Sequence, residues 1–185
     1  MKLGPRAQLV LIGALFLSPI AASLVAYNFM SHESTANYGE LIVPQLVTVQ
    51  PFERPGGARF TFAELSGRWV MVASDSGACE AACLEKLTAM RQVRLALGRN
   101  AARVERVFVV DDVRPMDPAR LKDFEGTEAV RTPLGLTLPA GPANDRAHMY
   151  LVDPHGNVML RWPAGGDRKR MLKDMERLLK ASQIG

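Results

Sequence analysis

The sequence predicts an α/β domain with a central mixed sheet and helices on both faces, preceded by one transmembrane helix at the N-terminus. Two patterns support this prediction: an uncharged apolar stretch opens the chain, and short apolar runs then alternate with helical patterns. The composition is that of a globular protein, with 185 residues of which 48% are hydrophobic and 23% charged. It excludes the disordered, collagenous and disulfide-dense classes of protein.

The N-terminal stretch is long enough to cross a membrane. Residues 7–32 carry no formal charge, and about 20 apolar residues span a bilayer. Lys2 and Arg6 precede the stretch and Glu33 follows it, so the positive-inside rule places the N-terminus in the cytoplasm. We therefore predict that residues 1–33 are the cytoplasmic N-terminus and anchor of a single-pass protein of the inner membrane. The remaining chain lies on the periplasmic or other extracytoplasmic side.

A cleaved signal peptide is the alternative interpretation of this stretch. Small residues at positions 21–23 resemble a processing site. The apolar stretch continues to Met30, which favours an uncleaved anchor. Both interpretations export the rest of the chain.

The exported part is predicted to contain a linker, residues 34–44, and one folded domain, residues 45–185. Ser, Asn, Gly and Pro in the first segment are typical of a linker. The domain then begins with an extended segment, residues 45–52, and a turn at residues 54–57. Residues 69–73 form a continuous apolar run, which predicts a buried strand.

The elements that follow alternate between helix and strand. Leucine, methionine and valine recur at helical spacing over residues 80–97, and Gly98 can end that helix. Asp117 and Pro118 are a good start for a short helix. In order, we expect a helix at 80–97, a strand at 104–110, a short helix through Phe124, a loop at 125–146, a hairpin of strands 148–152 and 157–162, and an amphipathic helix at 167–180.

The two cysteines of the chain, Cys79 and Cys83, lie where the predicted strand 69–73 passes through a loop into the helix 80–97. The positive end of a helix dipole stabilises a thiolate, which makes the sulfur a better nucleophile or metal ligand. Residues i and i+4 share one helix face, so both sulfurs can meet in one disulfide or at one metal. We predict a working redox or metal pair. Two buried small side chains, or an inert disulfide, are the structural alternatives.

The motifs around these cysteines resemble the Sco/SenC family of membrane-anchored copper chaperones. The resemblance rests on Gly67-Arg-Trp-Val-Met-Val, on Cys79-x-x-x-Cys83, on a strand ending in Asp111-Asp112, and on Met149-Tyr-Leu-Val-Asp-Pro-His-Gly156. It implies a thioredoxin-like fold over roughly residues 45–180. It also implies a role in assembling the copper centre of cytochrome c oxidase, by delivering copper, by reducing cysteines of an oxidase subunit, or both.

Two positions depart from the pattern of this family. The copper-binding histidine of the family falls at Asp145 in this chain, and Glu80 stands where the family has proline after its first cysteine. His148 is the nearest histidine, three residues from the expected position, and an odd offset along a strand turns a side chain to the other face.

Copper is the expected metal, held by Cys79, Cys83 and His148. Copper(I) prefers thiolate and thioether ligands. Met116, Met149 or Met159 could therefore take the third position instead of His148.

The sequence is compatible with three functions. The first is a Sco-like assembly factor whose partner is an oxidase subunit or another exported thiol or copper protein. The second is a metal-free thiol-disulfide oxidoreductase, and the third is a thioredoxin-like interaction module that has lost its copper site. Chaperoning or thiol exchange fits better than a turnover enzyme. The basic residues, 23 against 19 acidic, are dispersed, which gives no support for a nucleic-acid partner.

Overall fold

The structure is a computed structural model that describes residues 4–29, 37–48, 50–132, 141, 144–182 and 184. The chain divides into two compact units, Met1–Ala36 and Asn37–Gly185. We describe each unit by itself.

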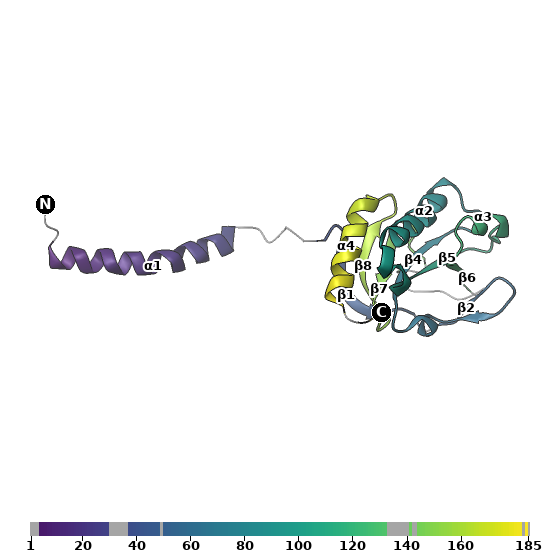
Figure 1. Cartoon of the computed structure of the whole chain (residues 1–185), viewed down its shortest axis with the longest axis horizontal. Coiled ribbons are helices and arrows are strands. Elements are labelled where there is room, and N and C mark those ends of the chain that lie inside the picture. Colours follow the sequence, from purple (N-terminus) through teal and green to yellow (C-terminus); the bar gives the residue numbers. More distant parts are fainter. Residues whose placement is uncertain are drawn as a thin grey trace. The chain divides into compact units, whose positions relative to one another are not determined.

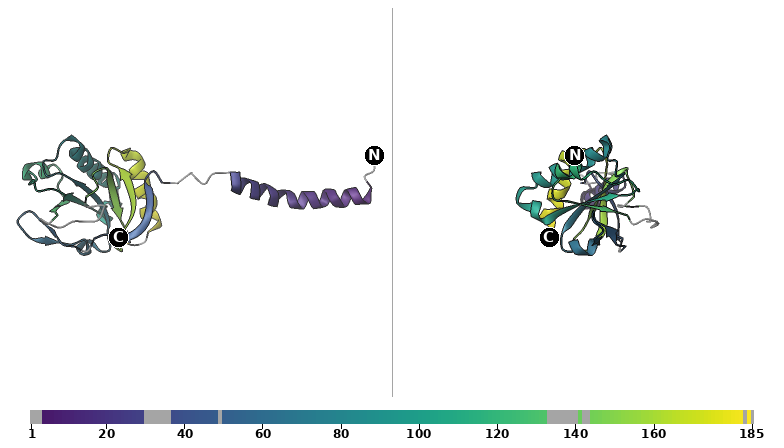
Figure 2. Two further views of the ribbon diagram at one scale, coloured as in Figure 1. Left: turned by 180° about the vertical axis from the view of Figure 1, so that it is seen from behind. Right: turned by 90° about the vertical axis from the view of Figure 1, so that its right-hand side faces the viewer.

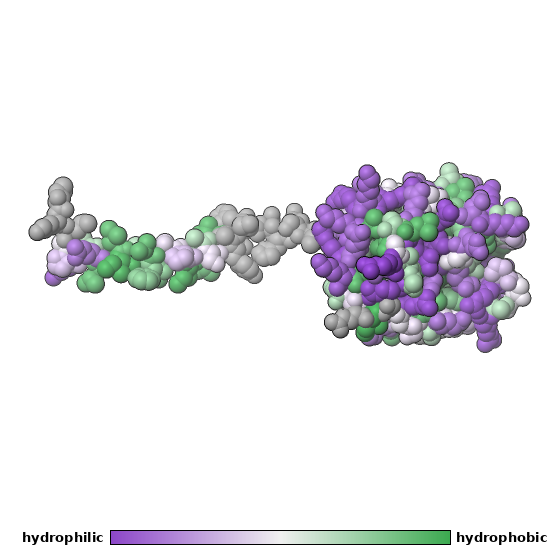
Figure 3. Space-filling view, viewed as in Figure 1, coloured by the Kyte–Doolittle hydropathy of each residue, from purple (hydrophilic) through white to green (hydrophobic). Residues whose placement is uncertain are grey.

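The first unit contains one helix, α1 (Pro5–Phe29). Within it the window Pro5–Val25 has a hydropathy of 2.1 and none of it is buried, and Figure 3 shows its apolar surface. A helix of this length extends about 37 Å at 1.5 Å per residue, so α1 is long and apolar enough to cross a membrane. Residues 30–33 of the predicted anchor lie outside the described residues.

The second unit is built on an eight-stranded mixed sheet in the order β1-β8-β7-β4-β5-β6-β2-β3 (Figures 1 and 2). β4, β5 and β6 are parallel, whereas β7, β8 and β1 continue the sheet in antiparallel pairs. The strands are β1 (Glu40–Leu46), β2 (Phe52–Glu53), β3 (Arg59–Phe60), β4 (Trp69–Asp75), β5 (Val104–Val110), β6 (Thr127–Arg131), β7 (His148–Val152) and β8 (Asn157–Pro163).

Two hydrophobic clusters cover the two faces of the sheet. α2 (Ala81–Ala96) and α4 (Arg168–Ala181) pack on one face through residues such as Leu87 and Met175. We call this the α2 face. On the second face Phe52, Phe60 and Phe62 pack against the sheet, the last of them from the 3-10 helix η1 (Phe62–Leu65). The two longer helices of this unit thus share one face, and the other face is covered by the β2–β3 hairpin and η1. A short helix, α3 (Pro118–Lys122), and a 3-10 helix, η2 (Gly98–Arg103), complete the unit.

The thioredoxin-like fold class and most predicted elements are confirmed, including the strand 104–110 and the hairpin strand 148–152. The prediction of a loop over residues 125–146 was wrong in part, because Thr127–Arg131 is β6. Only Ala129 and Val130 in this strand are apolar, so its pattern is weak, and it forms by pairing in parallel with β5.

The predicted linker also needs correction at its end. Glu40–Leu46 is β1, which pairs with β8 at the edge of the sheet. Its side chains are largely exposed, with 86% of Val43 accessible, so the sequence lacks the alternation that marks a half-buried strand. Pro44 is tolerated there because edge strands need fewer N–H donors.

The start of the folded unit is attached to its last helix. Asp174 on α4 is only 1% exposed, and its carboxylate accepts hydrogen bonds from the backbone N–H groups of Tyr38 (2.9 Å) and Gly39 (2.8 Å). Trp162 Nε1 donates to the same carboxylate at 3.0 Å. This buried acceptor is satisfied by three donors, as a buried charge requires.

Candidate redox site at the start of α2

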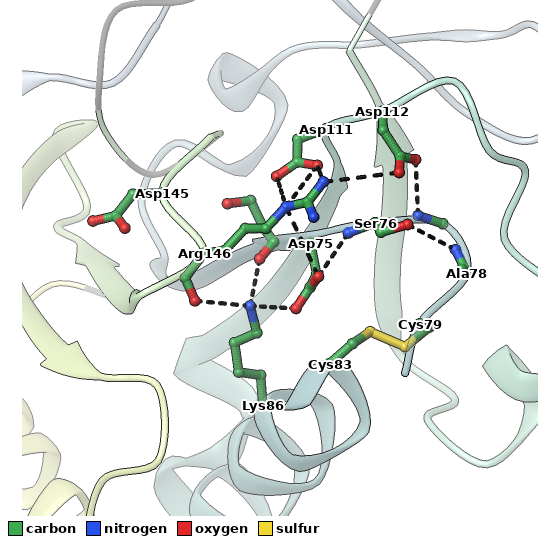
Figure 4. Close-up of polar contacts among 12 residues, drawn as sticks. Asp75, Ser76, Ala78, Cys79, Cys83, Lys86, Asp111, Asp112, Asp145 and Arg146 are labelled. Carbon is green, nitrogen blue, oxygen red and sulfur yellow. Dashed lines mark hydrogen bonds and ion pairs between the residues drawn. A yellow bond between two sulfur atoms is a disulfide. The ribbon is translucent and has the colours of Figure 1, made fainter. Parts of the chain in front are cut away.

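The site is centred on a disulfide between Cys79 and Cys83, with a Cα–Cα distance of 5.0 Å. Cys79 lies in the loop between β4 and α2, and Cys83 lies in the first turn of α2. Figure 4 shows the bond joining loop and helix. The structure therefore brings the two predicted residues together at the positive end of a helix dipole, which favours a thiolate once the bond is reduced.

Cys79 has a φ of +42°, in the left-handed region that side chains other than glycine rarely adopt. Such a conformation costs about 1–3 kcal/mol and persists where the surrounding structure enforces it. The loop has the contacts to do so, because Cys79 N–H donates to Ser76 O at 3.0 Å and Ala78 N–H donates to Ser76 Oγ at 3.1 Å.

Both cysteines are buried, Cys79 at 0% and Cys83 at 1% exposure. The loop before Cys79 is in contact with residues 114–121, which we call the cover segment. A Cβ atom on Gly77 would lie 1.9 Å from Arg114 O, so only glycine fits there. From the same segment, Arg120 Nη1 donates to Cys79 O.

A buried ion pair lies next to the disulfide. Lys86, one helical turn after Cys83, is 1% exposed, and its Nζ lies 2.6 Å from Asp75 Oδ2. The same ammonium donates to Ser74 O at 2.6 Å and to Arg146 O at 3.1 Å. With three acceptors the buried charge is fully paired, which such a group requires to remain charged.

Arg146 links this pair to the carboxylates at the end of β5. Its guanidinium forms a two-pronged contact with Asp111, including Nε to Oδ2 at 2.9 Å, and lies 3.8 Å from Asp112. Figure 4 shows the network running from Lys86 through Asp75 and Arg146 to these two aspartates. The hydrogen bonds that Arg146 donates to the Asp111 carboxylate raise the pKa of Arg146 above its ordinary value.

Asp112 connects the network to the cysteine loop. Its Oδ1 accepts from Gly77 N–H at 3.0 Å and from Arg114 N–H at 3.1 Å, so one carboxylate holds the loop and the start of the cover segment together. Burial raises the pKa of this carboxyl, but hydrogen bonds from Ser76, Gly77 and Arg114 outweigh it, and the net pKa lies below the ordinary value.

His148 belongs to a different group of side chains, on the second face of the sheet. Successive residues of a strand point to opposite faces, and Met149 packs on the α2 face whereas Tyr150 packs on the second face beside His148. Asp145 Oδ2 lies 2.7 Å from His148 Nδ1 and accepts from the Tyr150 hydroxyl at 2.6 Å. Burial and this carboxylate raise the pKa of Tyr150 to about 12.

The described residues contain no group of three Cys, His, Asp or Glu side chains suited to hold a metal ion. Both cysteines and the three candidate methionines, Met116, Met149 and Met159, belong to the α2-face cluster or pack against it. Met116 lies within the cover segment itself. The donor set that fits copper(I) on this face is therefore two thiolates with a thioether available, and no imidazole.

The sequence pattern does not identify Asp75, Lys86 and Arg146 as part of the site. A lysine three residues after Cys83 reads as an ordinary solvated helix position, and Arg146 was expected in a loop. The aspartate that ends the strand before the cysteine loop was the available signal, because its carboxylate falls at the carboxyl edge of the sheet.

Residues 69–182 match the family model described as a transmembrane-like, thioredoxin-like, C-terminal domain. The chain belongs to this family. In this thioredoxin-like domain family, the matched residues run from β4 to the end of α4 and include both cysteines. No curated protein matches the sequence.

Solved structures with the same fold include several Sco proteins. The apo Sco1 protein of Thermus thermophilus is 18% identical, with a TM-score of 0.63 over 80% of this chain and 99% of that one. Copper-bound yeast Sco1 is 17% identical, with a TM-score of 0.61 over 76% and 96% of the two chains. The thioredoxin domain of a Bacteroides vulgatus thiol-disulfide oxidoreductase is 14% identical, with a TM-score of 0.54 over 76% and 99%. The resemblance to Sco proteins is thus confirmed in the fold.

Proposed function

We propose that the chain is a membrane-anchored, Sco-like assembly factor whose working centre is the Cys79–Cys83 pair, acting by thiol-disulfide exchange with an exported partner. The observation that carries the proposal is the disulfide at the strand-to-helix junction of a thioredoxin-like domain, with Cys83 in the first turn of α2. The fold is shared with Sco proteins and with a thiol-disulfide oxidoreductase.

The exchange is balanced within the two dithiol pairs. In the reduced chain, one cysteine thiolate attacks a disulfide sulfur of the partner, forming a mixed disulfide and releasing a partner thiolate. The second cysteine of the chain then attacks the mixed disulfide and releases the other partner thiolate. The products are the Cys79–Cys83 disulfide and a reduced partner pair. Two electrons pass to the partner, and its two thiolates take up protons according to pH.

We infer that access to the sulfurs depends on movement of the cover segment. Cys79 and Cys83 are at most 1% exposed, so neighbouring residues must move before a partner sulfur reaches them, and residues 114–121 contact the cysteine loop. The contacts that resist this movement are the Asp112 hydrogen bonds and the Arg120 bond to Cys79 O.

We also propose that the chain carries copper, because its fold is shared with copper-bound Sco structures. The reduced cysteines would supply two soft thiolate ligands on the α2 face, and Met116, which packs against the same hydrophobic cluster, is the thioether that we propose as a third ligand. The proposed client is a cytochrome c oxidase subunit or another exported thiol or copper protein.

The location follows from the N-terminal unit. α1 is a candidate single membrane span. The charges that flank it, Lys2 and Arg6 before it and Glu33 after it, support a cytoplasmic N-terminus. We infer that the thioredoxin-like unit lies on the periplasmic or extracytoplasmic side of the inner membrane.

Titration of the full chain in detergent tests both activities. For copper binding, the reduced protein is titrated with copper(I) against a competing chelator. For thiol exchange, the Cys79–Cys83 pair is equilibrated with glutathione buffers of known potential. We expect about one copper bound per chain and a disulfide potential of about −270 to −120 mV, the range of exchange pairs, whereas structural disulfides lie below about −300 mV. Cys79→Ser and Cys83→Ser should each abolish both.

The results separate the three candidate functions. Copper binding lost in both variants supports the assembly-factor proposal. A measurable exchange potential without copper binding replaces it with metal-free thiol exchange. Neither activity in the wild type overturns both and leaves an interaction module.

A further inference from the structure

A cavity lies at the carboxyl ends of the parallel strands β5 and β6. Its volume is about 270 Å³, and its lining comes from β5, β6, the turn after β2 and the cover segment. β4, which leads to Cys79, ends at Asp75, and its neighbour β5 ends at Val110, which lines the cavity. In open α/β sheets, ligands bind in crevices outside the carboxyl ends of the strands.

The floor of this cavity is apolar. Val110, Ala129 and Val130 supply the strand side, each at most 8% exposed, and Met116, Pro118 and Leu121 supply the side formed by the cover segment. Pockets for drug-sized ligands run from about 300 to 1,000 Å³. The cavity is below that range and is sized for one large apolar side chain.

Arginines form the rim. Arg54, Arg114 and Arg131 line the cavity together with one carboxylate, that of Glu53. Arg54 is paired with Glu64 and Glu128, and Arg131 is paired with Glu53 at 2.6 Å. Arg114 lies 3.6 Å from Asp112 and its side chain is 63% exposed, so its guanidinium is placed to bind a further carboxylate from solution.

The cover segment contacts both the cavity and the cysteine loop. Met116, Pro118 and Leu121 of the cover segment face the cavity, while Arg120 of the same short helix binds Cys79 O and the Arg114 carbonyl lies against Gly77. A side chain seated in the cavity therefore contacts the segment that must move before a partner sulfur can reach the cysteines.

We propose that this cavity is the docking site for the partner polypeptide, which inserts one large apolar side chain flanked by carboxylates. The apolar floor takes the side chain and Arg114 takes a flanking carboxylate. The inference rests on the proposed function, since it names the part of the exchange partner that the chain recognises.

Binding of short cysteine-free peptides to the full chain in zwitterionic nanodiscs tests this site. The fluorescein-labelled probe is Gly-Asp-Phe-Asp-Gly, compared with Gly-Lys-Phe-Lys-Gly and Gly-Asp-Ser-Asp-Gly, and anisotropy over empty nanodiscs is the readout. We expect saturable binding of the first peptide, at least about tenfold tighter than either of the others, because the second reverses the charge and the third removes the apolar group.

Matched variants locate the binding. Leu121→Glu should weaken the affinity for the first peptide by at least about tenfold, because the substitution places a charge in the apolar floor. Leu95→Glu, at a 58% exposed position of α2, should leave binding unchanged. Arg114→Gln alters only a surface side chain and should weaken binding by about threefold, so the site is tested even if Leu121→Glu fails to fold.

Equal affinity for the three peptides, no saturable binding, or undiminished binding in Arg114→Gln and in folded Leu121→Glu each overturns the docking site. The peptides carry no cysteine and no copper is added. Exchange and copper binding are therefore measured separately, and either proposal can fail without the other.

Discussion

The ion pairs on the two faces of the sheet differ in how deeply they are buried. On the α2 face, Lys86 and Asp75 form an ion pair with side chains 1% and 14% exposed, next to a fully buried disulfide. On the second face, Asp145 and His148 form a comparable contact at 2.7 Å, but their side chains are 25% and 30% exposed. Water reaches both partners of the second pair and little of the first, so similar distances carry unequal energies.

Removal of one partner from the buried pair should have the largest effect on stability. Asp75→Asn leaves the Lys86 ammonium without its carboxylate, and we expect the free energy of unfolding to fall by about 3–5 kcal/mol. The measurement is urea unfolding of the full chain in detergent. In Asp75→Leu/Lys86→Met both charges are gone and most of the loss should be recovered. A loss below about 1 kcal/mol in Asp75→Asn would show that the pair behaves as an exposed one.

A methyl group at Gly77 should loosen the cover of the disulfide. In Gly77→Ala the new Cβ would collide with Arg114 O, and overpacking of this kind costs about 1–3 kcal/mol. We expect the disulfide to be reduced by dithiothreitol about tenfold faster, since about 1.4 kcal/mol is a factor of ten in the open population. Gly165→Ala is the control, because its Cβ would meet nothing within 4 Å. An unchanged reduction rate would mean that the segment does not limit access.

Acid should affect the second face through Asp145. Burial raises the pKa of this carboxyl. Hydrogen bonds from Tyr150, His148 and Ala147 N–H lower it by more, so the net pKa is below its ordinary value. A lowered folded-state pKa stabilises the fold above the unfolded-state pKa of about 3.9, and this stabilisation is lost as the pH falls through the folded-state pKa.

Asp145→Asn should abolish that part of the acid sensitivity. At pH 7 we expect the variant to have a free energy of unfolding about 1 kcal/mol below that of the wild type. At pH 3 this difference in free energy of unfolding should be smaller, and urea unfolding at both pH values measures it. A gap that is the same at both pH values would assign the loss to packing instead of to the charge.

Loss of the His148 imidazole should have the smallest effect on the cysteine site. Because its ring lies on the second face, His148→Ala should leave copper(I) affinity within about twofold of the wild type, whereas Met116→Ala should weaken it by about tenfold. Competition titration with a chelator measures both. A large loss in His148→Ala would place the imidazole in the copper site after all.

The sequence pattern was sufficient for elements that bury a regular apolar face. The strand 104–110 and the strand 148–152 were predicted with their exact bounds, because nearly every side chain in them is buried. The pattern does not predict β1 and β6, because each forms by hydrogen bonding to a neighbouring strand that is distant in the sequence. Such pairing leaves no local pattern of apolar residues.

The candidate site was predictable in part for a similar reason. The positions of Cys79 and Cys83 follow from local order, strand then loop then helix, and strand alternation alone predicts that His148 is turned away. Lys86 and Arg146 could not be predicted, because their contacts with Asp75 and Asp111 join residues 11 to 35 positions apart only after the sheet has formed.

The Asp174 carboxylate has a mechanical consequence. It holds the backbone of Tyr38 and Gly39, directly after Asn37, at which the folded unit begins. A pull on α1 is therefore transmitted first to α4 and Trp162, and β1 is loaded only if these hydrogen bonds break. In a force experiment that pulls the chain by α1, Asp174→Asn should make the edge strand β1 peel at lower force, while the cysteine loop stays folded.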